Sequence, residues 1–186
     1  MSKRNIKDKI VKKLDIPGGV SARMEIHTLI VEGPRGEARR VIKKSSTVIR
    51  IEGKNIIVES ERVTRRDKKI VGTLIAHINN MLNGVLNNHT YILKICSGHF
   101  PMNVAVSGNK FIVKNFLGEK VPRVLQLKES ATIKVEGDLI YVSSADKELA
   151  GQVSADIEQL TRRPGYDSRI FQDGCYIVNK GGRELR

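Results

Sequence analysis

The stretch LIVEGPRGEA at residues 29–38 returns later in the chain as FIVKNFLGEK at residues 111–120. In both copies a short apolar run leads into a turn that contains glycine. Gly36 and Gly118 stand at the matching place, where a residue without a side chain accepts turn geometry most easily. The phrase therefore predicts the same strand and turn twice in one chain.

The similarity extends on both sides of this phrase at an offset of about 84 residues, until a loop about five residues longer in the first copy shortens the offset before the last pair. The matching pairs are IPGGV (16–20) with FPMNV (100–104), IRIEGKNIIVES (49–60) with IKVEGDLIYVSS (133–144), and IVGTLIAHINNML (70–82) with LAGQVSADIEQL (149–160). Because the order of the segments is kept, each copy is predicted to fold as one unit.

Each copy shows the same sequence of expected elements. Short runs rich in β-branched residues alternate with glycine turns, which is typical of antiparallel strands joined by hairpins. A segment with apolar residues at helical spacing then closes each copy, from Ile70 to Val85 and from Leu149 to Leu160. We therefore predict an α+β fold of two tandem homologous domains, residues 1–86 and 87–160, each an antiparallel sheet covered by one amphipathic helix. A basic C-terminal arm is expected at residues 161–186.

Composition narrows the class of partner. The chain has 186 residues and a formal net charge of +13, which favours a polyanion or an anionic membrane surface, with nucleic acid the stronger candidate. The apolar runs are far shorter than the roughly 20 residues of a membrane span. No signal-peptide pattern follows the basic N-terminus, so a cytosolic protein without a membrane partner is expected.

Enzyme and metal motifs are missing from the sequence. The four histidines show no HExxH spacing, no phosphate-binding loop occurs, and Cys96 and Cys175 stand apart, so we expect no enzyme, cofactor or metal. Asp173 precedes Gly174, where an Asx-type turn bond is the expected role. DNA binding is disfavoured because neither a helix-turn-helix nor zinc spacing is present. A free RNA-binding module, such as an RNA chaperone, stays open as the alternative.

Three further segments, HFPMN (99–103), NFLGEK (115–120) and RIFQDGCYIVNK (169–180), together resemble the large-subunit ribosomal protein six family. The resemblance is to its archaeal and eukaryotic form, called protein nine in eukaryotes, and covers essentially the whole chain. It implies a structural, non-enzymatic constituent of the cytoplasmic large subunit that binds large-subunit rRNA near the sarcin-ricin loop. The implied neighbours are other large-subunit proteins and components of the stalk base, where translation factors dock.

In that family the second domain and the following tail provide the principal RNA contacts. The residues that the resemblance implies for this role are Lys114, Asn115, Lys120, Arg123, Lys147, Arg162, Arg163, Tyr166 and Arg169. Alternatives remain for several positions. Any single basic residue could simply be solvated, Tyr166 could stack on a base or pin the tail, and Phe116 and Leu117 could pack on their own hairpin. The basic run TRRDKK (64–69) is expected to be an exposed loop before the helix.

Charge gives a partly different prediction from the resemblance. Residues 1–88 have 19 basic and 9 acidic residues, whereas residues 89–186 have 14 and 11, so charge alone places RNA on the first domain. Local charge matters more than a domain total because salt screens distant charges. With only 4 Phe, 4 Tyr and no Trp, stacking on single strands is not expected, and contact with the phosphates of folded RNA is favoured.

Overall fold

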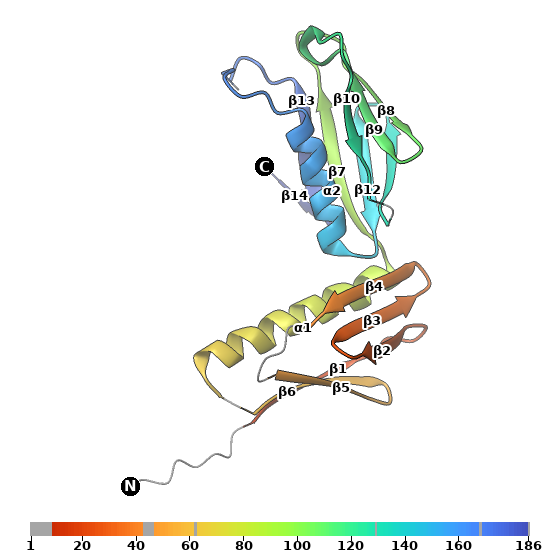
Figure 1. Cartoon of the computed structure of the whole chain (residues 1–186), viewed down its shortest axis with the longest axis vertical. Helices are drawn as coiled ribbons and strands as arrows, with labels where there is room; N and C mark the ends of the chain where they lie inside the picture. Colours follow the sequence, from red (N-terminus) through yellow and green to blue (C-terminus); the bar gives the residue numbers. More distant parts are fainter. Residues whose placement is uncertain (1–8, 43–46, 62, 129, 168, 186) are drawn as a thin grey trace. The chain divides into compact units, whose positions relative to one another are not determined.

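The structure is a computed structural model that describes residues 9–42, 47–61, 63–128, 130–167 and 169–185. The basic N-terminal segment at residues 1–8 lies outside the described residues. The chain divides into two compact units, Met1–Asn87 and Asn88–Arg186 (Figure 1). Each unit is described by itself below.

The first unit consists of two three-stranded antiparallel sheets and one long helix. The sheet orders are β1-β6-β5 and β2-β3-β4. Helix α1 packs against strands β3, β4 and β6. The elements are β1 (Ile10–Asp15), β2 (Ser21–Glu25), β3 (Thr28–Gly33), β4 (Gly36–Val41), β5 (Thr47–Glu52), β6 (Asn55–Ser60) and α1 (Arg65–Leu86).

The second unit repeats this plan and adds strands at its C-terminal end. Its sheets have the orders β11-β12-β7-β13-β14 and β10-β9-β8, and α2 packs against β7, β12 and β13. The elements are β7 (His89–Cys96), β8 (Asn103–Ser107), β9 (Lys110–Lys114), the 3-10 turn η1 (Phe116–Gly118), β10 (Arg123–Gln126), β11 (Thr132–Glu136), β12 (Leu139–Ser144), α2 (Lys147–Leu160), β13 (Gly174–Lys180) and β14 (Arg183–Glu184).

The predicted α+β duplication is confirmed, with two refinements. Each unit contains two antiparallel sheets rather than one. The repeated phrase also ends differently in the two copies. Gly36 directly closes the β3–β4 hairpin at a φ of 136°, whereas in the second copy Gly118, at a φ of 78°, ends the η1 turn. The connection between β9 and β10 is therefore longer than the turn between β3 and β4, and it contains η1.

The predicted C-terminal arm is wrong for residues 174–184. Strand β13 pairs antiparallel with β7, so it is part of the second unit's main sheet. Burial is the physical reason, because Cys175 is fully buried and belongs to the core with Leu93 and Ile157, while Ile177 packs against that core. Among the described residues, 161–167 and 169–173 connect α2 to β13.

The predicted loop at residues 64–69 is also wrong, because α1 already begins at Arg65. Thr64 is the N-cap, and its hydroxyl oxygen accepts a hydrogen bond from the Asp67 backbone N–H at 3.2 Å. The Asp67 carboxylate in turn accepts from the Thr64 backbone N–H at 3.4 Å. This reciprocal capping box satisfies backbone donors that the first helical turn leaves unpaired.

Candidate nucleic-acid interface

Three segments that are far apart in the sequence meet in the second unit. They are the loop after β7, the η1 turn and the 161–173 loop. Between η1, the end of α2 and this loop lies a cavity of about 710 Å³, here called the aromatic groove. Its lining includes three residues predicted for RNA contact, Arg162, Arg163 and Tyr166.

Asp173 ties the loop after β7 to the start of β13. Its carboxylate accepts hydrogen bonds from the backbone N–H of Gly98 at 2.7 Å and of His99 at 3.0 Å, and it lies 2.6 Å from His99 Nδ1. Burial acts to raise the pKa of Asp173, but the hydrogen bonds from His99 and Gly98 outweigh it and hold the pKa below its ordinary value. The expected Asx turn is therefore replaced by a long-range anchor.

Aromatic contacts continue from this anchor towards the groove. The His99 ring stacks on Phe171 with centroids 4.9 Å apart, and Tyr166 meets Phe171 edge-on at the same separation. The Arg163 guanidinium lies 4.4 Å from the centre of the Tyr166 ring. Such stacked and cation–π contacts define the position of a loop that contains Pro164 and Gly165.

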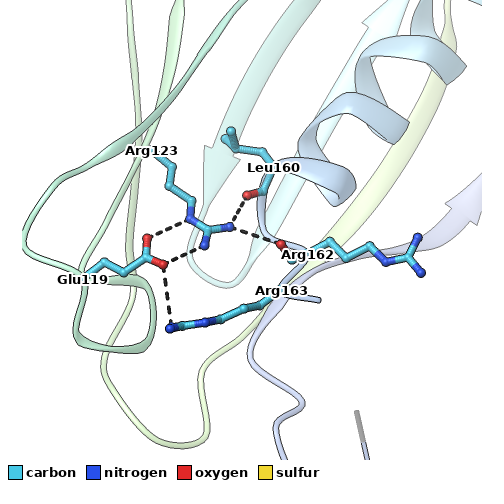
Figure 2. A network of polar contacts seen from close by, with 5 residues as sticks. All are labelled: Glu119, Arg123, Leu160, Arg162 and Arg163. Atoms are coloured by element: carbon cyan, nitrogen blue, oxygen red, sulfur yellow. Dashed lines mark hydrogen bonds and ion pairs between the residues drawn. The ribbon is translucent and has the colours of Figure 1, made fainter. Parts of the chain in front are cut away.

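Arg123 connects the η1 turn to the end of α2 (Figure 2). It makes two hydrogen bonds to the Glu119 carboxylate, at 2.8 and 2.7 Å, and donates through Nη1 to the Leu160 carbonyl at 2.6 Å. These bonds place a cation at the C-terminus of α2, where unpaired carbonyls and the helix dipole favour it. Its guanidinium also lies 4.3 Å from the centre of the Phe116 ring.

Glu119 also forms an ion pair with Arg163 in the same network. Arg163 Nη1 lies 3.7 Å from Glu119 Oε1, the same oxygen that accepts a hydrogen bond from Arg123 Nη2 (Figure 2). The hydrogen bond from Arg123 lowers the pKa of Glu119, and the charge of Arg163 adds to this effect. Glu119 therefore stays ionised and holds both arginines at the groove.

The structure gives the other predicted residues different surroundings. Arg162 is exposed and its guanidinium points away from the network (Figure 2). Lys114 and Lys120 are also exposed, and within the described residues neither these lysines nor the Arg162 side chain form an ion pair or hydrogen bond. These three cations are available to a polyanion.

The last three predicted residues either have hydrogen-bond partners within the fold or lie far from the groove. The Asn115 side chain donates to the Pro101 carbonyl at 3.0 Å, which holds the η1 turn to the neighbouring loop. Arg169 makes hydrogen bonds to the Asp167 carboxylate at 3.1 and 2.9 Å, and this pairing lowers the pKa of Asp167. Lys147 begins α2, so it lies about 20 Å from Arg162 along a helix of 14 residues.

Several residues of this site were not singled out by sequence reasoning. Glu119, His99 and Phe171 have no local signal of their role, because their partners are brought to them by the fold. The available signal was the set of three segments behind the family resemblance. HFPMN contributes His99, NFLGEK contributes Phe116 and Glu119, and RIFQDGCYIVNK contributes Phe171 and Asp173.

The corresponding sheet of the first unit has a different electrostatic character. On strands β2–β4, Arg23 pairs with Glu25 at 3.1 Å and with Glu32 at 2.9 Å, and Arg39 pairs with Glu37 at 2.5 Å. Two basic residues of this unit, Arg23 and Arg39, are therefore already paired with acidic residues within one sheet. Fewer of its cations are available to phosphates than the number of basic residues indicates.

The part of the chain that the structure describes has the features of neither a metal site nor a membrane-spanning helix. No cluster of three or more metal-ligating side chains occurs there. None of the helices in that part has the length and apolar character needed to cross a membrane.

Comparison with known proteins agrees with the geometry of two repeated units. The sequence profile described as "Ribosomal protein L6" matches residues 16–88 and 100–174, one segment in each unit. The chain is 40% identical over 176 residues to the large ribosomal subunit protein uL6 of Methanococcus vannielii, covering 95% of this chain and 97% of that protein. It is 38% identical over 173 residues to uL6 of Methanothrix thermoacetophila, covering 93% and 98%. The chain belongs to the ribosomal protein L6 family.

Proposed function

We propose that the second unit of this chain binds large-subunit rRNA near the sarcin-ricin loop and the base of the stalk, where translation factors dock. Membership of the L6 family makes the chain a structural, non-enzymatic component of the cytoplasmic large ribosomal subunit. The finer location is the proposal. Neighbouring large-subunit proteins and stalk-base components would then be its protein partners.

The arrangement of available cations is the observation that supports this proposal most. Arg162 lies beside the aromatic groove, and Lys114 and Lys120 flank the η1 turn that borders the same groove. Phosphate contacts position a protein on folded RNA, and each neutralised phosphate releases counterions. Three cations of the second unit without internal partners in the described part of the chain suit such contacts.

The nine residues predicted from the sequence would then have unequal roles. We assign direct phosphate contact to Lys114, Lys120 and Arg162. Arg123 and Asn115 act as positioning residues, because their polar groups are engaged within the fold. Arg163 and Tyr166 would shape the groove, since they line it and contact each other.

The remaining two residues would contact RNA in other ways. Arg169 would have to share its guanidinium between Asp167 and RNA. Lys147, at the other end of α2, would mark a separate point of contact.

Hydroxyl-radical footprinting tests the location. The full-length protein is added to a transcript of the large-subunit rRNA region that contains the sarcin-ricin loop and the adjoining helices. Protection is expected near that loop and is expected to weaken for the triple variant Lys114→Ala, Lys120→Ala, Arg162→Ala. A control variant replaces two ion-paired cations of the first unit, Arg23 and Arg39, by Ala. Protection elsewhere, or equal loss in both variants, would contradict the proposal.

A further inference from the structure

The aromatic groove concentrates a residue type that is scarce in this chain. Of 4 Phe and 4 Tyr in the whole sequence, four line this one cavity. They are Phe116, Tyr166, Phe171 and Tyr176. The scarcity of aromatic residues predicted little stacking on RNA bases, but a count over the whole chain does not describe a site where half of them meet.

Three of the four groove rings already have ring or cation partners. Phe116 is covered by Arg123, Tyr166 by Arg163, and Phe171 by His99. Tyr176 is the exception, because among the described residues it makes no ring or cation–π contact, and it is 40% exposed. An exposed ring without a partner, inside a cavity of otherwise paired rings, is an available stacking surface.

The Tyr176 ring lies close to the backbone of Gly174, in space that a side chain at Gly174 would occupy. A Cβ at Gly174 would lie 3.4 Å from ring atoms of Tyr176 and 3.3 Å from the Thr161 hydroxyl oxygen. The backbone there has a φ of 154°, which residues with side chains rarely adopt. The position of the Tyr176 ring at the groove therefore depends on the bare backbone beside it.

The groove also offers the polar groups that a nucleotide requires. Its volume of about 710 Å³ lies within the range of about 300–1,000 Å³ found for small-molecule sites. Gln159, whose side-chain amide can both donate and accept hydrogen bonds, is one of the lining residues. Arg162, whose guanidinium has no internal partner in the described part of the chain, supplies a cation for the phosphate.

We propose that the aromatic groove receives one unpaired nucleobase of the rRNA, which stacks on Tyr176 while its phosphate pairs with Arg162. This inference rests on the proposed binding of rRNA by the second unit and adds the local mode of recognition. Stacking on an aromatic side chain accepts any base, because every base has a π-face. The groove would then read an extruded nucleotide through RNA shape rather than through sequence.

Two RNA hairpins with the same stem test this mode with the full-length protein. One has a single-nucleotide bulge of 2-aminopurine, and in the other that base is paired. Affinity for the bulged hairpin is expected to be roughly 10-fold higher, because each base that stacks on an aromatic side chain strengthens binding. The 2-aminopurine fluorescence of the bulged hairpin is expected to be quenched on saturation. Tyr176→Phe should retain both effects and Tyr176→Leu should lose both.

The outcomes separate this inference from the proposed function. Equal affinity for the two hairpins, with salt-dependent binding and unchanged fluorescence, would overturn base insertion and leave RNA binding by the second unit intact. Absence of binding to both hairpins and to the rRNA transcript would overturn both. The comparison of the two hairpins uses the wild-type protein, so it remains decisive if Tyr176→Leu proves unstable.

Discussion

The Asp173 carboxylate, with 3% of its side chain exposed, holds both the backbone and the ring of His99, a residue 74 positions earlier in the chain. Each half of this pair lies in a segment without regular secondary structure. The pair therefore fixes two loops to each other at the border of the aromatic groove. Hydrogen bonds to an ionised and buried acceptor are among the stronger ones in proteins.

Replacing Asp173 by Asn is expected to lower the free energy of unfolding by about 1–3 kcal/mol. The amide is neutral and has one acceptor oxygen, whereas the carboxylate is charged and uses both of its oxygens. The pKa of Asp173 is lowered in the folded state. Its contribution is therefore present above the unfolded-state pKa, near pH 4, and is lost as pH falls through the lower folded-state value. Urea unfolding of wild type and variant should show a difference at neutral pH that closes in acid. A constant difference at all pH values would assign the effect to packing alone.

Replacing Arg123 by Met is expected to destabilise the second unit by about 1–3 kcal/mol, because Glu119 and the Leu160 carbonyl lose a charged partner. The double variant Arg123→Met, Glu119→Gln should recover part of this loss, since the unpaired carboxylate is then removed. Urea unfolding monitored by circular dichroism measures the stability of both variants. A double variant that is no more stable than Arg123→Met would show that the unpaired Glu119 carboxylate is not a source of the loss.

Replacing Arg162 by Ala should lower the slope of log affinity against log salt by roughly one for the rRNA transcript, because one phosphate contact is lost. Arg39→Ala is the matched control. It removes the same charge from a residue that is paired with Glu37 in the first unit, and an unchanged slope is expected. Filter binding over a range of salt concentrations gives both slopes. Equal slopes for wild type and Arg162→Ala would remove this residue from the phosphate contacts.

Replacing Gly33 by Ala should destabilise the first unit by about 1–3 kcal/mol, since a Cβ there would lie 2.8 Å from both the Val85 side chain and its carbonyl oxygen. Gly72 provides the control. It lies exposed within α1, and a Cβ added there would meet no atom within 4 Å, so Gly72→Ala should stabilise by up to about 1 kcal/mol. Thermal unfolding of the two variants should therefore shift in opposite directions. A neutral Gly33→Ala would show that β3 and α1 can separate freely at this point.

Much of the fold could be predicted because its signals are local. The duplicated phrase, the alternation of apolar residues and the glycine turns each act over a few neighbours, and they predicted two α+β units correctly. The beginning of α1 was missed because the Thr64–Asp67 capping box lies in a run of charges that is typical of an exposed loop. Strand β13 was missed because a basic segment was interpreted by its charge and not by the apolar positions that bury it.

The sequence by itself determined the duplication, the fold class and the family of this protein, because these depend on patterns that are readable along the chain. Only the tertiary structure decided which charges are available. Arg123 and Arg162 look equivalent in the sequence, yet one closes the end of α2 through Glu119 and Leu160 while the other points away from that network. Availability depends on partners that folding brings from distant segments, and the same convergence gathers four aromatic rings into one groove.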